Sequence, residues 1–214
     1  MNEIAIVGAG GFGREVKMLI EQINKKELKY TFIGFFDDSI LKGTLVNNFP
    51  VLGTIDDLNK WNKPLSIVLA IGSPKTKLDI INKIINPQIF YPVLIHPNVL
   101  IGENDENTIG EGSIICAGVI ITVNVKIGKH VIINLSCTVG HDTELNDYCS
   151  VMPGVNISGE VKIESGVYIG TGAKIINQLV IGESTIIGSG AVVAKSLPSR
   201  CTAVGVPAKI IKID

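Results

Sequence analysis

The sequence lacks the marks of several large protein classes. It has no basic leader and no uncharged run of about eighteen apolar residues, so it predicts neither a signal peptide nor a membrane-spanning helix. Its formal net charge of −1 gives no electrostatic case for nucleic acid or an anionic membrane as a partner. We therefore expect a soluble cytoplasmic protein without membrane insertion.

The motifs of several common sites are missing too. The four cysteines show no Cys-x-x-Cys spacing, and we interpret them as buried reduced thiols: Cys116, Cys137, Cys149 and Cys201. No zinc spacing, no Ser-His-Asp order and no Walker lysine occurs. We expect an ordered chain with a sizeable core, because 46% of its 214 residues are hydrophobic and 23 are glycine.

What is present is a strict repeat of six residues. An aliphatic residue stands at every sixth position from Ile109 to Val193, and a small or apolar residue follows each of them four positions later. This period fits neither a helix nor a two-faced strand, and it predicts a triangular parallel β-helix in which each hexad supplies one strand and one corner. Glycine often follows the aliphatic residue directly, and we interpret it as easing the turn.

The repeat also predicts the length and limits of the β-helix. Fifteen hexads at three per coil give about five coils, stacked at roughly 4.7–4.9 Å. The alternative, an ordinary β-sandwich, would show strict alternation and a turn about every 8–12 residues. Two extra residues around 104–107 interrupt the spacing between Ile101 and Ile109, and after Val193 the chain leaves the repeat as a tail.

The first 95 residues have a different pattern, in which apolar strands alternate with helices. We predict strands over 3–7, 31–36, 65–71 and 89–95. We predict helices over 14–23, after an N-cap at Thr54, and from Pro74 to about Asn86 with Ser73 as N-cap. The alternation predicts a small Rossmann-like parallel α/β domain over 1–95, followed by the β-helix domain over 96–214.

A glycine-rich turn lies between the first strand and the first helix. It contains Gly8, Gly10, Gly11 and Gly13. Backbone N–H groups and the helix dipole favour a phosphate at such a turn. The second strand ends in Asp37 and Asp38, about where an acidic residue reaches a ribose hydroxyl. One mononucleotide-sized unit favours a nucleotide or nucleotide-sugar ligand over NAD; the alternative is that the glycines only permit tight strand–helix packing.

Three histidines could take part in acid–base chemistry: His96, His130 and His141. His141 precedes Asp142 and lies two positions after an inward aliphatic residue, which predicts an exposed corner. An imidazole beside a carboxylate is suited to accept a proton near neutral pH. The residues alone leave open that His141 is an ordinary solvated residue. Asn134 lies seven residues earlier, where we expect the coil below, and we interpret His96 and His130 as structural.

Six motifs along the whole chain occur in the order in which one family carries them. They are Ile-Val-Gly-Ala-Gly-Gly-Phe-Gly-Arg-Glu at 6–15, Phe-Asp-Asp at 36–38, Ala-Ile-Gly-Ser at 70–73, Ile-His-Pro at 95–97, Val-Gly-His-Asp at 139–142 and Gly-Val-Pro-Ala-Lys at 205–209. The chain thus resembles the bacterial hexapeptide-repeat acyltransferases with a left-handed β-helix. It is most similar to their sugar O-/N-acetyltransferases, which include the sialic acid O-acetyltransferase (NeuD) type and the nucleotide-linked amino-sugar N-acetyltransferases.

The resemblance implies an acetyl-CoA-dependent N-acetyltransferase, without a metal, that acts on a nucleotide-activated 4-amino-4,6-dideoxy sugar for surface polysaccharide. It implies direct transfer, with His141 as general base and Asp142 as its partner. It also implies a homotrimer with acetyl-CoA between neighbouring β-helices. The implied coenzyme contacts are Ser150, Gly159 and Thr171. The implied contacts of the nucleotide sugar are Gly8, Gly10, Gly11, Gly13, Asp37, Asp38, Gly72, Ser73 and Asn134.

Two positions depart from the family pattern. Ser150 stands where many relatives carry a second histidine. The thioester carbonyl would then be polarised by the Ser150 hydroxyl or by a backbone N–H. Phe12 stands where many relatives carry histidine in the glycine turn.

Three other functions remain open at this stage. An O-acetyltransferase of sialic acid or another sugar hydroxyl would use the same fold and base. A non-catalytic β-helix scaffold or nucleotide-sugar sensor would leave His141 idle. An NAD dehydrogenase would need a second nucleotide half, which this sequence lacks.

Overall fold

The computed structural model describes residues 1–102 and 106–213. The chain forms two compact units, Met1–Pro97 and Asn98–Asp214. Among the described residues, no helix is long and apolar enough to cross a membrane.

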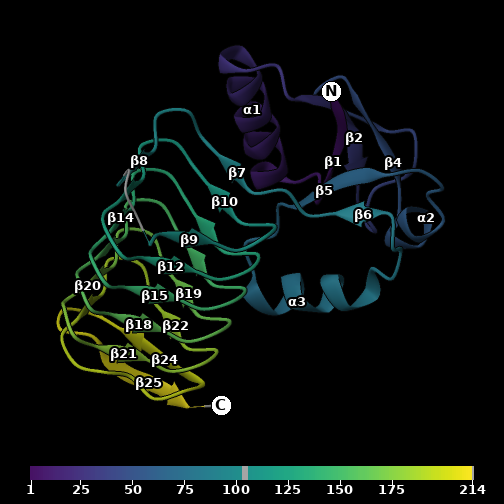
Figure 1. The fold of residues 1–214 in the computed structure, drawn as a ribbon. Coiled ribbons are helices and arrows are strands. Elements are labelled where there is room, and N and C mark those ends of the chain that lie inside the picture. Colours follow the sequence, from purple (N-terminus) through teal and green to yellow (C-terminus); the bar gives the residue numbers. More distant parts are fainter. Residues whose placement is uncertain (103–105, 214) are drawn as a thin grey trace. The chain divides into compact units, whose positions relative to one another are not determined.

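The first unit is a six-stranded sheet in the order β3-β4-β2-β1-β5-β6, with helices on both faces (Figure 1). Its strands are β1 Asn2–Val7, β2 Tyr30–Phe36, β3 Leu45–Val46, β4 Phe49–Gly53, β5 Leu65–Leu69 and β6 Ile89–Phe90, and β7 Leu94–Ile95 follows. Its helices are α1 Gly11–Lys26, α2 Ile55–Asn59 and α3 Pro74–Lys83. All neighbours pair in parallel except β3 and β4. The predicted parallel α/β unit is confirmed.

The pleat of β1 explains why both faces of the sheet are covered. Ala5 and Val7 belong to a core cluster with Ile55 of α2, and α3 side chains pack against that cluster. Ile4 and Ile6 point to the opposite face, where α1 packs on β1 and β2, and they too are fully buried. A strand buried on both faces reads as the continuous apolar run found in the sequence.

Some elements differ from the prediction for local reasons. The expected strand 89–95 is divided into β6 and β7, because Pro92 cannot donate to a ladder. Helix α3 stops before Asn86, whose side-chain amide donates to the carbonyls of Leu58 and Trp61. The unpredicted β3–β4 hairpin turns at Asn47 and Asn48, both with positive φ, and this Asn-Asn pair is a turn signal present in the sequence.

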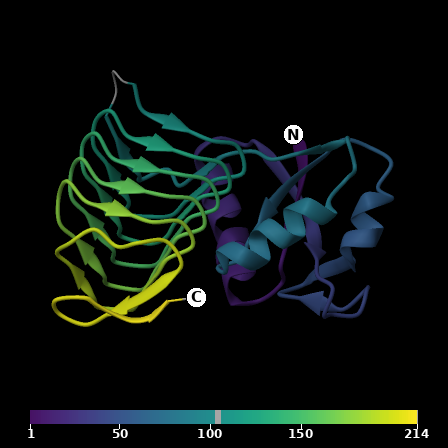
Figure 2. The same cartoon turned by 90° about the horizontal axis from the view of Figure 1, so that it is seen from below.

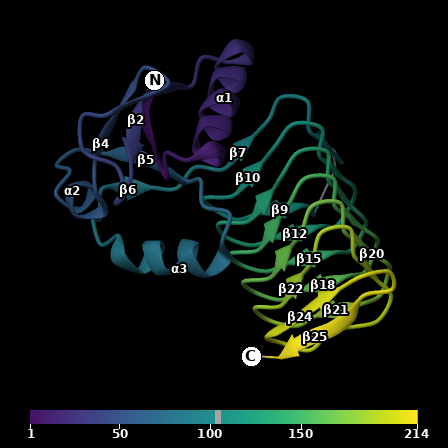
Figure 3. The same ribbon diagram turned by 180° about the vertical axis from the view of Figure 1, so that it is seen from behind.

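The second unit is a left-handed parallel β-helix of two-residue strands (Figure 2). Its first face contains β10 Ile114–Ile115, β13 Ile132–Ile133, β16 Ser150–Val151, β19 Tyr168–Ile169 and β22 Ile186–Ile187, then β24 Cys201–Val204 and the antiparallel β25 Lys209–Ile213. The second face contains β8 Leu100–Ile101, β11 Ile120–Ile121, β14 Thr138–Val139, β17 Asn156–Ile157, β20 Lys174–Ile175 and β23 Val192–Val193. The third face, aligned in Figure 3, contains β9 Thr108–Ile109, β12 Lys126–Ile127, β15 Glu144–Leu145, β18 Lys162–Ile163 and β21 Val180–Ile181.

The repeat residues fill the inside of the β-helix as predicted. The inward aliphatic residues from Ile115 to Val193 are each at most 3% exposed. All four cysteines are buried free thiols, and burial raises the pKa of Cys137 to about 11. These thiols are therefore packing residues.

Strand register locates the two extra residues of the first coil. Lys126 pairs with Thr108, which is 126 − 108 = 18 positions away, whereas Ile120 pairs with Leu100, 120 − 100 = 20 positions away. The predicted interruption between the second and third faces is confirmed, although part of it, residues 103–105, lies outside the described residues.

Each corner between β9 and β23 contains one residue in the left-handed region, three positions after the inward aliphatic residue. These residues, with φ between 53° and 73°, are Gly112, Gly118, Asn124, His130, Ser136, Asp142, Tyr148, Gly154, Glu160, Gly166, Gly172, Gln178, Ser184 and Gly190. The glycine that directly follows the aliphatic residue was predicted to ease the turn, but its role is a different one. A Cβ on Gly170 would lie 2.5 Å from the Ser189 nitrogen, so that glycine permits close stacking of coils.

Candidate active site

His141 and Asp142 form a dyad at the corner between β14 and β15. His141 Nδ1 lies 2.8 Å from Asp142 Oδ2, and the two side chains are 56% and 49% exposed. A carboxylate only accepts hydrogen bonds, so Nδ1 of the neutral imidazole carries the hydrogen and Nε2 keeps its lone pair. His141 therefore has the tautomer that a general base requires.

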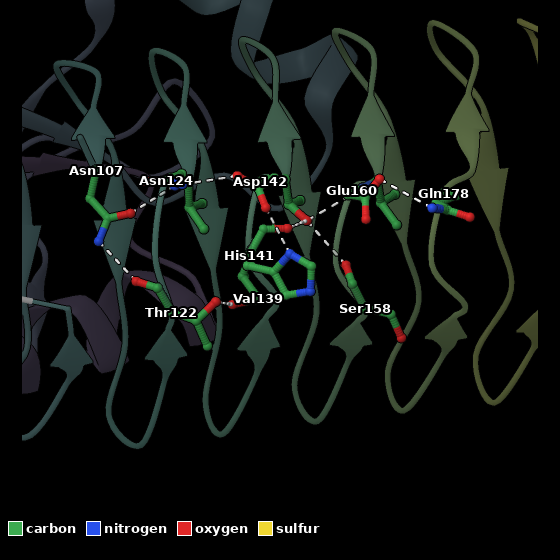
Figure 4. A network of polar contacts seen from close by, with 12 residues as sticks. Asn107, Thr122, Asn124, Val139, His141, Asp142, Ser158, Glu160 and Gln178 are labelled. Carbon is green, nitrogen blue, oxygen red and sulfur yellow. Dashed lines mark hydrogen bonds and ion pairs between the residues drawn. The ribbon is translucent and has the colours of Figure 1, made fainter. Parts of the chain in front are cut away.

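Asp142 is held by the preceding coil. Its other oxygen, Oδ1, accepts a 3.0 Å hydrogen bond from Asn124 Nδ2, and the two residues are 18 positions apart (Figure 4). The hydrogen bond from Asn124, and after it the one from His141, lowers the pKa of Asp142. The carboxylate therefore stays ionised near neutral pH and can stabilise an imidazolium beside it. The role of Asn124 was not predicted from the sequence, although its separation of 18 residues from Asp142, the length of one coil, indicates that the two side chains stack.

The imidazole of His141 lies against Gly159 of the next coil. A Cβ on Gly159 would be 2.5 Å from Nε2 and 2.6 Å from Cε1 of His141. The same position on other coils of this corner carries a side chain, as in Val123 and Asn177. The fold itself therefore accepts a side chain here, and the glycine is required by the imidazole. Gly159 was expected among the coenzyme contacts, and the structure places it directly beside the His141 imidazole.

The other predicted β-helix residues do not meet at this corner. Asn134 follows β13, so it lies one corner back on the same coil and not on the coil below as expected, because one coil takes 18 residues. It is 6% exposed, and its Oδ1 accepts a hydrogen bond from the Leu135 N–H at 2.7 Å. Ser150 is fully buried in β16 of the first face, and the exposed Thr171 follows β19 of that face.

The glycine turn of the first unit divides into two pairs. Gly8 has φ +98°, and a Cβ on Gly13 would overlap the Gly8 carbonyl oxygen, so this pair serves tight strand–helix packing. Among the residues that the structure describes, a Cβ on Gly10 would meet nothing within 4 Å, and a Cβ on Gly11 would meet only Arg14 Nη2 at 3.9 Å. Both are exposed at the start of α1, where backbone N–H groups have no helical partner. Packing therefore explains Gly8 and Gly13, and the space over Gly10 and Gly11 fits a ligand.

Acidic and polar residues of the neighbouring strand ends lie beside this turn. Asp37 Oδ2 accepts a hydrogen bond from the Ala9 N–H at 2.9 Å, and its Oδ1 accepts from the Ser39 N–H and hydroxyl. Burial alone would raise the pKa of Asp37, but these hydrogen bonds outweigh it and lower the pKa. Asp38 Oδ1 accepts from the Ile55 N–H at the start of α2 at 2.8 Å. Both carboxylates thus hold backbone N–H groups in place, a role that was not predicted from the sequence.

Gly72 and Ser73 follow the carboxyl end of β5. A Cβ on Gly72 would meet no described residue within 4 Å. Ser73 Oγ accepts from the Thr76 N–H at 3.3 Å as the predicted N-cap of α3. Strands β2 and β5 flank β1 in the sheet; the chain continues from β1 to β2 and β4 on one side and returns to β5 on the other. Their carboxyl ends therefore meet at the switch point where open α/β sheets bind ligands.

Among the residues that the structure describes, no group of three His, Cys, Asp or Glu side chains could hold a metal ion.

Replacing Gly13 with alanine is expected to destabilise the first unit. The new methyl group overlaps the Gly8 carbonyl, and overpacking of this kind costs about 1–3 kcal/mol of the free energy of unfolding. Denaturant unfolding measures the change. The matched control is Gly11→Ala, whose methyl group would lie 3.9 Å from Arg14 Nη2, an ordinary contact, and suits a helix. Equal stability of the two variants would contradict the packing role of Gly13.

Comparison with known proteins supports both units. The family model described as "PglD N-terminal domain" matches residues 3–84, and the model described as "Bacterial transferase hexapeptide (six repeats)" matches residues 160–195. GDP-perosamine N-acetyltransferase of Escherichia coli O157:H7 is 36% identical over 129 residues. That match covers 60% of this chain and 58% of the relative, which is less than two thirds of its length.

Two solved structures match along nearly the whole chain. WeeI from Acinetobacter baumannii AYE is 36% identical with a TM-score of 0.88, over 99% of this chain and 100% of its own. A His-to-Asn mutant of perosamine N-acetyltransferase from Caulobacter crescentus, in complex with CoA and GDP-perosamine, is 29% identical with a TM-score of 0.87. That match covers 100% of this chain and 98% of the other.

Proposed function

Because this chain belongs to the hexapeptide-repeat sugar N-acetyltransferases, we propose that it transfers the acetyl group of acetyl-CoA to the amine of a GDP-linked 4-amino-4,6-dideoxy sugar. The observation that carries the proposal is the His141–Asp142 dyad, whose Nε2 is free of the carboxylate. The choice of GDP and of this sugar class rests on the substrate that the similar proteins are named for.

The first unit would hold the nucleotide. Its diphosphate suits the open space over Gly10 and Gly11, where the N–H groups at the start of α1 offer donors and a positive dipole end. Asp37 and Asp38 still have acceptor capacity for a ribose or a base edge, since each ionised carboxylate takes up to about four hydrogen bonds. Gly72 and Ser73 would line the same edge, and Asn134 remains a proposed contact of the sugar.

The chemistry would be a direct transfer. The sugar nitrogen attacks the thioester carbonyl carbon, the C–N bond forms, and the C–S bond breaks to release coenzyme A. Nε2 of His141 takes the proton that the nitrogen loses, and the imidazolium returns it to the leaving thiolate. Asp142 stabilises the imidazolium while it exists. The Gly159 N–H, beside the imidazole, is the proposed donor to the oxyanion, because Ser150 is buried on another face.

We place the enzyme as a homotrimer in the cytoplasm, in the synthesis of a surface polysaccharide. Exposed apolar side chains along the β-helix, such as Ile120, Ile176 and Val180, favour burial against further copies. The coenzyme would lie along such an interface, near Thr171. Sedimentation that gives the mass of a single chain would contradict the trimer, and cell fractionation checks the compartment.

The proposed reaction is tested by transfer from acetyl-CoA to GDP-perosamine. We expect release of the coenzyme thiol with formation of the N-acetyl sugar, detected by mass spectrometry. GDP-mannose, which offers only hydroxyls, is the matched acceptor for O-acetylation, and dTDP- and UDP-linked 4-amino sugars test the nucleotide. Transfer to GDP-mannose but not to GDP-perosamine would overturn the N-acetyl assignment. Preference for a dTDP- or UDP-linked sugar would overturn the assignment of GDP and leave the assignment of N-acetyl transfer intact.

A further inference from the structure

We propose that Asn124 is a positioning residue for this reaction, which holds the Asp142 carboxylate so that Asp142 can hold His141. The inference rests on the proposed function for its kinetic consequence, but its structural consequence can be measured without any substrate.

The two hydrogen bonds of Asp142 use different oxygens. Oδ1 accepts from Asn124 Nδ2 at 3.0 Å, and Oδ2 faces His141 Nδ1 at 2.8 Å. The torsion that turns a carboxylate about its own bond is broad, and Asp142 is half exposed, so one contact alone would leave the group free to rotate. Two contacts on opposite oxygens fix the plane of the carboxylate and, through it, the direction of the imidazole.

Asn124 is itself held by the coil before it. Asn107 Oδ1 accepts from the Val125 N–H at 2.7 Å, and Asn107 Nδ2 donates to the Thr122 carbonyl at 2.9 Å (Figure 4). One side chain thus bridges the backbone on both sides of Asn124. The preceding coil therefore fixes the backbone on both sides of Asn124, and this limits the positions that the Asn124 amide can take.

The same corner also contains a contact without a histidine. Gln178 Nε2 donates to Glu160 Oε2 at 3.2 Å, again from residues 18 positions apart and both with positive φ. Such amide–carboxylate pairs therefore belong to the stacking of the corner as well. The Gln178–Glu160 pair supplies the control that separates a stacking role from a positioning role.

The test compares Asn124→Gly with Gln178→Gly. Glycine suits both positions, because it already occupies the equivalent left-handed corners at Gly112, Gly118 and Gly154. We expect Asn124→Gly to lower kcat about tenfold with little change in either KM, the scale of one hydrogen bond to a charged group. Gln178→Gly should stay within about twofold. Asn124→Asp, which keeps the size but replaces the donor with an acceptor, should lose at least as much as Asn124→Gly.

A double-variant cycle tests whether Asn124 acts through the carboxylate. In an Asp142→Gly background, Asn124→Gly should change kcat by less than about twofold, because the group that it positions is gone. The full tenfold loss in that background, a loss confined to KM, or an unchanged kcat in the single variant would each overturn the proposal.

NMR of the imidazole nitrogens measures the tautomer ratio of His141 without any acetyl transfer. The wild-type protein without substrates should show His141 mainly with its hydrogen on Nδ1, and Asn124→Gly should increase the Nε2–H form while Gln178→Gly does not. An unchanged tautomer ratio in Asn124→Gly would contradict the positioning role. Failure of wild-type acetyl transfer with the expected tautomer change would count against the proposed function alone.

Discussion

His141→Asn should lower kcat by about two or more orders of magnitude while the protein keeps its fold and binds both ligands. The exposed corner tolerates the change, because the side chain is 56% exposed and its Nδ1 contacts another exposed side chain, Asp142. Asparagine has no basic nitrogen, so the sugar amine must attack without a base. Steady-state kinetics measures the loss, and calorimetric titration with coenzyme A and GDP checks that binding survives.

The control for this variant is Asn177→Ala at the same corner. Asn177 occupies the equivalent position 177 − 141 = 36 residues later, two coils away, and its replacement should leave kcat within about twofold. Turnover at the wild-type rate in His141→Asn would remove His141 from the mechanism. A loss of ligand binding instead of kcat would assign it to substrate recognition.

Gly159→Ala should lower kcat about a hundredfold with almost no change in stability. The added methyl carbon would lie 2.5 Å from Nε2 of His141, so the imidazole must shift by about 1 Å, and a shift of that size in a reacting group costs about 10²-fold. The free energy of unfolding should change by less than about 0.5 kcal/mol, because the same position carries a side chain on other coils.

A double variant tests whether Gly159 is needed to leave space for the His141 imidazole. In a His141→Asn background the smaller side chain leaves room, and Gly159→Ala should then have only a small further effect. A crystal structure of Gly159→Ala should show the imidazole displaced from Asp142. If Gly159→Ala destabilises the protein and leaves the imidazole in place, the glycine is required for folding and not for the position of His141.

Much of the fold could be predicted from the sequence, because every hexad buries an aliphatic side chain at the same position. A single inward position repeated from Ile109 to Val193 fixes the β-helix, and the two extra residues before Ile109 appear as a shift in register. The α/β unit followed from strands with continuous apolar runs. The hairpin at Asn47 and Asn48 was missed because its strands are short and only the turn carries a signal.

The site was predictable only in part. His141 and Asp142 are adjacent in the chain, so the contact between their side chains could be expected from the sequence alone. Asn124 is joined to them only by stacking over 18 residues, and such a partner emerges when polar residues are aligned by coil. The bracing role of Asp37 depends on the Ala9 backbone across two strands, which no local pattern encodes.

The stacking of Asn124, Asp142 and Gly159 on three successive coils also limits how this chain can evolve. A parallel β-helix is modular, since each coil contacts only its neighbours, and duplication of one coil preserves every strand register. A coil inserted between Asp142 and Gly159 that carries a side chain at the position of Gly159 would leave the architecture intact and yet separate the glycine from the imidazole. The strand register therefore tolerates such an insertion, whereas the contact between His141 and Gly159 does not.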